Sequence, residues 1–168
     1  MNFILETERL RLREFTLGDS LFIIELLNSP GWLQFIGDRN VKTEEQAIAY
    51  LENGPLKSYT VNGYGLWLVE TKEDEKPIGM CGIINREYLN NPDIGFAFLP
   101  GYHGQGYAFE VVSATMDYAK QHLKISKMEA ITISENERSI RLLEKIGLRF
   151  SKTFCFPDSK DALLLYSN

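Results

Sequence analysis

A glycine-rich loop between an apolar segment and a long amphipathic segment restricts the fold of this chain most strongly. Residues 93–99 (DIGFAFL) have the pattern of a strand, and residues 105–123 have the apolar spacing of a helix. In the loop between them, Gly104, Gly106 and the small Ala108 let backbone N–H groups approach a ligand closely. Because the start of a helix favours negative charge, the sequence predicts a phosphate or pyrophosphate site between a strand and a helix of an α/β fold.

The loop differs from two common phosphate-binding motifs. It has no GxxxxGK[ST] pattern, so it is not a P-loop. It also fails the dinucleotide-binding pattern GxGxxG, because Phe109 stands where the last glycine belongs and the loop comes late in the chain. On these residues alone, a tight turn without a ligand stays open as an alternative.

The rest of the chain alternates strand and helix patterns. Strands are predicted at 9–15, 65–71, 77–85, 93–99, 128–133, 149–156 and 162–166, and helices at 17–28, 44–53, 105–123 and 136–146. The order β-α-α-β-β-β-α-β-α-β-β predicts an α/β (α+β) fold in which helices flank a mixed, mostly antiparallel sheet. Because the 168 residues contain no linker or repeat, we expect a single domain over 1–168.

Composition excludes several classes of protein. No apolar run reaches ~18 residues, so no membrane span or membrane partner is expected. The first residues become charged too soon for a secretory signal, which indicates the cytoplasm. A net charge of −5 disfavours nucleic acid as the main partner. Two cysteines and two histidines without metal-ligand spacing predict neither a disulfide framework nor a metal site.

Two segments carry a resemblance to a known family. The strand DIGFAFLP, the loop HGQGYA at 103–108 and the helix FEVVSATMDYA resemble the acyl-CoA signature of GNAT superfamily N-acetyltransferases. Residues 136–147 (NERSIRLLEKIG) resemble the second signature of that superfamily. The opening TERLRLREF and the element order resemble the Rim-type branch, which acetylates the N-termini of ribosomal proteins. The resemblance covers nearly the whole chain and implies a GNAT-like fold with acetyl-CoA as cosubstrate and no metal.

The resemblance also implies a role for the motif residues. Backbone groups of Phe98 and Leu99 would pair with the pantetheine arm like an added strand, and a backbone N–H near them would hold the oxyanion. Asn136 would bond to the pantetheine, and Ser139 would lie near the thioester sulfur. The residues implied in cofactor binding are Phe98, Leu99, His103, Gly104, Gln105, Gly106, Tyr107, Ala108, Asn136, Ser139 and Leu143.

Three positions depart from the family pattern. His103 replaces the usual Gln or Arg, from which we expect weaker or altered phosphate contacts. Leu143 stands where many members carry a tyrosine that acts as general acid, so that role is vacant or moves to Ser139. Leu148 replaces a phenylalanine, which we interpret as a packing change.

The candidate catalytic and acceptor residues have ordinary structural alternatives. Asp93 is a candidate base because it opens the strand before the loop, although an acidic residue at a strand start is usually solvated. Without the resemblance, Asn136 would be a helix cap and Ser139 a solvated helical serine. Trp32 and Phe35, between the first two predicted helices, are candidates for a wall of the acceptor pocket.

The sequence thus predicts an acetyl-CoA-dependent N-acetyltransferase in which a primary amine attacks the thioester directly, in a ternary complex. A protein or peptide N-terminus is the expected acceptor, because an α-amino group has a pKa of ~7.7–8.0 and a lysine side chain ~10.4. Two alternatives stay open: an acetyltransferase of small amines such as polyamines or aminoglycosides, and a non-catalytic acyl-CoA sensor. Relatives of this type often pair, so a homodimer is a further candidate assembly.

Overall fold

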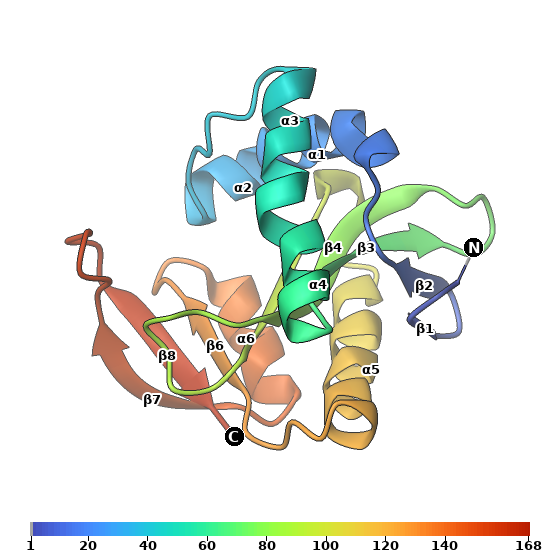
Figure 1. Ribbon diagram of the computed structural model, residues 1–168. Coiled ribbons are helices and arrows are strands. Elements are labelled where there is room, and N and C mark those ends of the chain that lie inside the picture. Colours follow the sequence, from blue (N-terminus) through green and yellow to red (C-terminus); the bar gives the residue numbers. More distant parts are fainter. Residues whose placement is uncertain (1) are drawn as a thin grey trace.

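An eight-stranded sheet in the order β1-β2-β3-β4-β5-β6-β8-β7 forms the centre of the computed structural model, which describes residues 2–168 (Figure 1). The strands are β1 (Leu5–Glu6), β2 (Leu10–Arg13), β3 (Leu66–Thr71), β4 (Pro77–Ile84), β5 (Asp93–Phe98), β6 (Glu129–Thr132), β7 (Arg149–Phe154) and β8 (Leu163–Ser167). The helices are α1 (Ser20–Leu27), α2 (Pro30–Phe35), α3 (Glu44–Leu51), α4 (Lys57–Asn62), α5 (Tyr107–His122) and α6 (Glu137–Lys145). Two 3₁₀ turns, η1 (Leu17–Asp19) and η3 (Pro100–Tyr102), and a π-helical turn, η2 (Glu52–Leu56), complete the elements.

Helices cover both faces of the sheet, and each face has its own apolar core. Adjacent residues of β3 separate the two cores, since Trp67 belongs to one and Leu68 to the other. Val111 and Val112 of α5 pack in the first core, and Ile23 of α1 packs in the second. The alternation of side chains along a strand places these neighbours on opposite faces. The predicted mixed sheet flanked by helices is therefore confirmed.

Two helical segments were missing from the sequence prediction. The residues Ser29-Pro30-Gly31 do end the helix expected at 17–28, but Pro30 is also the first residue of α2, and Ser29 precedes it in an extended conformation. Proline suits this position because the first N–H of a helix has no internal partner. Gly54 and Pro55 lie within η2, which joins α3 to α4 and continues the helical path to Asn62. Thr43 and Gln46 form a capping box at the start of α3, with Gln46 N–H donating to the Thr43 hydroxyl.

The pairing of β5 with β6 is parallel and short. Asp93 and Glu129, the first residues of the two strands, are the register pair, and β5 is otherwise paired along its length with β4. The crossover between them runs through α5, as a parallel connection requires. The two strands consequently separate towards their carboxyl ends, and this opening positions the candidate site.

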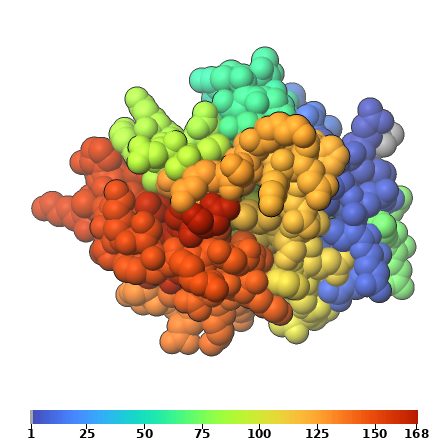
Figure 2. Space-filling view, turned by 90° about the horizontal axis from the view of Figure 1, so that it is seen from below, coloured from blue at the N-terminus to red at the C-terminus, as the bar shows by residue number. Residues whose placement is uncertain are grey.

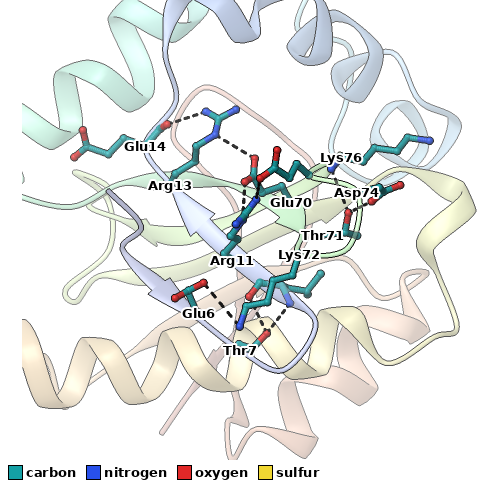
Figure 3. Close-up of polar contacts among 12 residues, drawn as sticks. Glu6, Thr7, Arg11, Arg13, Glu14, Glu70, Thr71, Lys72, Asp74 and Lys76 are labelled. Atoms are coloured by element: carbon teal, nitrogen blue, oxygen red, sulfur yellow. Dashed lines mark hydrogen bonds and ion pairs between the residues drawn. The ribbon is translucent and has the colours of Figure 1, made fainter. Parts of the chain in front are cut away.

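Ion pairs fix the N-terminal strand to the sheet (Figure 3). Arg11 and Arg13 of β2 both bond to Glu70 of β3, at 2.9 and 3.3 Å. Arg13 also forms two bonds of 2.9 Å to Asp19. Burial opposes ionisation of Asp19, but the contacts with Arg13 and Thr16 outweigh it and lower the pKa of this carboxyl. Because Arg9 directly precedes β2, this arrangement also sets the position of Arg9.

The C-terminal end of the chain lies among the segments around β6, as Figure 2 shows from below. Asn168 accepts a bond from Met128 N–H at 2.9 Å and donates to Ser126 C=O at 2.7 Å. No helix within residues 2–168 has the length and apolar character needed to cross a membrane.

Candidate active site

A cavity of about 790 Å³ lies at the opening between β5 and β6. Its lining comes from the two strands, the start of α6, helix α2 and the loop that follows α2. Several of the candidates from the sequence meet here, namely Trp32, Phe35, Asp93, Asn136, Ser139 and Leu143. These residues come from three separate parts of the chain, namely α2, β5 and the first turns of α6, and the opening of the sheet brings them to one space.

The edge of β5 that faces the opening has backbone groups available for a ligand. Leu99 N–H donates to Ile78 C=O of β4 at 2.9 Å, so this group is already used within the sheet. Antiparallel pairing alternates, and the backbone groups of Phe96 and Phe98 therefore point the other way, towards β6. The Leu99 N–H group expected to bind a ligand is not free to do so, whereas Phe98 lies on the correct edge.

The glycine loop leads into α5 through two left-handed backbone positions. Gly104 has φ 75° and Gly106 has φ 81°, a region that favours glycine. The first bond of the helix joins Glu110 N–H to Gly106 C=O at 3.0 Å. Within residues 2–168, the N–H groups of 104–109 have no backbone acceptor. They form a row of donors at the positive end of a sixteen-residue helix.

Arg9, near the N-terminus, contacts the glycine loop and the first turn of α5. Its Nε donates to Glu110 at 2.7 Å, its Nη1 donates to Gln105 C=O at 3.0 Å, and its guanidinium lies 4.3 Å from the centre of the Tyr107 ring. Thr7 donates to the other oxygen of Glu110 at 2.6 Å. Burial opposes ionisation of Glu110, but the bonds from Thr7 and Arg9 outweigh it and lower the pKa of that carboxyl. Reasoning from the sequence missed Arg9, because its partners lie far along the chain.

His103 connects the loop to α6. Its Nε2 lies 3.2 Å from Phe98 C=O, and its Nδ1 contacts Nη1 of Arg138. Burial and the charge of Arg138 lower the pKa of His103, so the ring is neutral at pH 7 and donates from Nε2 to the carbonyl. The contact brings the guanidinium of Arg138 next to the glycine loop, where His103 itself supplies no charge.

Asn136 and Ser139 form the cap of α6. The side-chain oxygen of Asn136 accepts a bond from Ser139 N–H at 3.3 Å, which confirms the cap predicted from the residues alone. Both side chains also line the cavity, together with the buried Leu143. The Ser139 hydroxyl has no hydrogen-bond partner among residues 2–168, so it is available to a ligand.

Asp93 is buried and lines the cavity, with only 1% of its surface exposed. The alternative of a solvated strand-start residue is therefore wrong. Arg86 Nε lies 3.1 and 3.2 Å from its two oxygens. Its register partner, Glu129, accepts a bond from Asn91 at 2.8 Å through one oxygen, and the other oxygen is buried without a partner. Burial raises the pKa of Asp93 to about 6, because Arg86 offsets only part of the cost and Glu129 adds to it.

The side of the cavity opposite α6 is aromatic and charged. Trp32 is 7% exposed, and its indole N–H is buried without a hydrogen-bond partner. Two arginines and three further carboxylates stand around this side, namely Arg39, Arg86, Glu87, Asp158 and Asp161. No group of three metal-binding side chains occurs in the part of the chain that the structure describes.

Solved structures share this fold. An acetyltransferase (GNAT family) from Bacillus anthracis superposes with a TM-score of 0.80 at 25% identity, covering 99% of this chain and 98% of that one. A ribosomal-protein-S5-alanine acetyltransferase from Vibrio fischeri gives 0.81 at 18% identity, with 100% and 96% covered. A chimera of the spermidine N-acetyltransferase SpeG, from Vibrio cholerae and hSSAT, gives 0.76 at 19% identity, with 94% and 93% covered.

Sequence relatives agree with these structures. The chain is 32% identical over 152 residues to the uncharacterized protein YkkB of Bacillus subtilis (strain 168), covering 89% of this chain and 87% of YkkB. It is 29% identical over 147 residues to the uncharacterized N-acetyltransferase YoaA of the same organism, covering 87% and 82%. Residues 9–149 match the acetyltransferase (GNAT) domain family. The chain therefore belongs to the GNAT acetyltransferase family and is an N-acetyltransferase.

Proposed function

We propose that this enzyme transfers the acetyl group of acetyl-CoA to the N-terminal α-amine of a protein or peptide, as the Rim-type resemblance implies. The observation that carries the proposal is Asp93, a buried carboxylate with a pKa of about 6 in the same cavity as Ser139. Such a base is matched to an ammonium group of pKa ~8 better than to a lysine of ~10.4, because the uphill proton transfer is smaller by ~2.4 pKa units.

Acetyl-CoA fits the residues present. The row of N–H groups at 104–109 suits the pyrophosphate, with Arg138 and Arg9 as neighbouring cations. The edge of β5 at Phe96, together with Phe98 N–H, suits the amides of the pantetheine arm, which would pair with it as a strand does; Phe98 C=O already accepts from His103. Asn136 has an amide N–H₂ available to the same arm. The sulfur would then lie between β5 and the start of α6, near Ser139.

The protein groups divide the chemistry as follows. Asp93, through one water, takes the proton that the amine loses as its nitrogen bonds to the thioester carbon. The N–H group of Phe98 supports the negative oxygen that develops on that carbon. The carbon–sulfur bond breaks, and Ser139 donates a hydrogen bond to the departing thiolate, which requires little further help because a thiol has a pKa of ~8.5.

A polyamine is the second candidate acceptor. Its support is the group of carboxylates on the acceptor side, Glu87, Asp158 and Asp161, which would attract a polycation. The fold does not decide between the two, because enzymes named for both kinds of acceptor share it. Arg39 and Arg86 on the same side weigh against a polycation. A sensor without chemistry would not require a buried base of raised pKa.

One peptide with a free N-terminus and an internal lysine tests the proposal. We expect mass spectrometry to place the acetyl group on the α-amine, with the initial rate rising between about pH 6.5 and 8 as that amine loses its proton. The control is the same peptide with a blocked N-terminus, which should release no free CoA thiol above background. Dominant acetylation of the lysine, or acetylation of spermidine but of no peptide, would contradict the proposal.

A further inference from the structure

A second cavity of about 760 Å³ adjoins the first, on the side of the helices before β3. It lies between the path α3–η2–α4 and the neighbouring ends of β3 and β4, which Figure 1 shows side by side. Four residues line both cavities, namely Arg39, Tyr50, Leu66 and Ile84. A ligand that enters the first cavity from the acceptor side can therefore extend into the second.

The second cavity has a different charge from the first. No carboxylate lines it, although the chain contains 23 acidic residues and four of them line the first cavity. Its cations are Arg39 and Lys57, and neither forms an ion pair with another residue of 2–168. In an acidic protein, a cleft with two unpaired cations and no acid is complementary to a neutral or anionic ligand.

Side-chain amides supply most of the remaining polar lining. They belong to Asn40, Gln46, Asn53, Asn62 and Asn85. Asn53 donates to Ala49 C=O at 2.9 Å, which leaves its own oxygen without a donor among residues 2–168. Asn62 is bonded to Ser58 and Asn85, and the oxygen of Gln46 accepts from Thr43 N–H. The oxygens of Asn53 and Asn85 and the N–H₂ of Gln46 have no partner among residues 2–168, so they can match the N–H and C=O of a peptide group. The π-helical turn η2 forms one wall, and such turns occur frequently at functional sites.

We infer that this second cavity, the amide groove, binds the segment of an acceptor peptide that follows the acetylated residue, and that it favours a neutral or acidic segment over a basic one. The inference rests on the proposed function, because the amide groove would bind the acceptor residues that extend beyond the first cavity. A polyamine has no carbonyl oxygen for the N–H₂ of Gln46 and would meet the two cations Arg39 and Lys57. The chemistry of the groove thus selects a peptide.

A series of peptides with the same first two residues tests this inference. The series contains a dipeptide amide and three hexapeptides whose last four residues are acidic, neutral or lysine-rich. We expect the KM of the acidic hexapeptide to lie about tenfold below that of the dipeptide, and the KM of the lysine-rich one to lie above that of the acidic one. Lys57→Glu should reverse the order of the acidic and lysine-rich peptides, with unchanged thermal stability because Lys57 is exposed.

The matched control is Lys152→Glu, an exposed lysine on β7 outside both cavities, which changes net charge equally. This variant should keep the parent's order of KM values. The inference about the amide groove is wrong if the dipeptide and the hexapeptides are acetylated at their N-termini with equal KM, or if both variants change the order of KM values alike. The proposed function stands in either case. If no peptide is acetylated, the proposed function fails and the groove fails with it.

Discussion

Asp93 shows how position changes the chemistry of a residue. In the sequence it is one acidic residue at the start of a strand, where solvation is the ordinary expectation. The fold buries it beside Arg86 and Glu129, and burial raises its pKa to about 6 from the model-peptide value of 3.8. Because the pKa is raised, the folded protein keeps a proton on Asp93 up to about pH 6, and the carboxylate is available as a base only above that pH.

Replacing Asp93 tests its role as the base. We expect Asp93→Asn to lower kcat about 10²–10⁴-fold, with little change in the KM for acetyl-CoA. Its fold should survive, because the variant removes a charge whose burial becomes more unfavourable as the pH rises from about 4 towards 6. The measurement is kcat between pH 5 and 8.5, with thermal unfolding as the check of folding. A variant that keeps the parent's kcat would remove Asp93 from the mechanism.

Replacing Glu129 is a more specific test of the role of Asp93, because Glu129 affects the pKa of Asp93 without lining the cavity. Its negative charge contributes to the raised pKa of Asp93. Glu129→Gln should therefore lower that pKa and move the acid limb of the pH profile to lower pH, with kcat near its parent value at pH 8. The Asn91 bond can be retained by the new amide oxygen. A purely structural role would change kcat at all pH values without moving the limb.

At the scale of elements, local signals in the sequence were sufficient for every strand of the sheet except the two-residue β1 and for the two helices α5 and α6 of the site. The glycines before α5, the Thr43 capping box and the mostly apolar residues of β5 each act over a few residues, so a sequence pattern can show them. The signals around Pro30 and Pro55 were ambiguous, because proline both ends helices and begins them. The contact of Arg9 with the glycine loop, by contrast, depends on strand packing and has no local signature.

The glycine loop gives a prediction for acetyl-CoA binding. At Gly106, φ is 81° and an added Cβ would lie 3.3 Å from Nη2 of Arg9. Gly106→Val therefore strains the backbone and displaces the Arg9 side chain from the loop. We expect the Kd for acetyl-CoA, measured by calorimetry, to rise about tenfold or more. Gly101→Ala is the matched control, because a Cβ there meets no atom within 4 Å and its φ is ordinary. Equal affinity in both variants would contradict the loop assignment.

At the scale of the whole molecule, the site exists because β5 and β6 pair only at their first residues and then separate. The sequence predicted the order of the elements from β3 to β8 and one parallel crossover, but not that β5 and β6 would register at Asp93 and Glu129 and then separate. That separation depends on how α5 and α6 pack on one face, which involves residues from the entire chain. The same dependence explains why the second cavity and its amides escaped prediction, since α3, α4 and β4 meet there only in the folded state.

An opening between two parts of one sheet predicts that acetyl-CoA stabilises the whole protein. The ligand would pair with β5 on one side and contact α6 on the other, so it would replace the strand contacts that the sheet lacks. Binding at 100 times Kd adds about 2.7 kcal/mol to the free energy of unfolding, which corresponds to a rise in Tm of roughly 5–10 °C for a chain of this size. Amide hydrogen exchange should slow at Phe96 and Phe98 and also at 136–139, whereas pantetheine without the nucleotide should produce a smaller rise in Tm. Protection confined to the loop at 104–108 would show that the ligand does not bridge the two parts, and would place the thioester outside the cavity that contains Asp93 and Ser139.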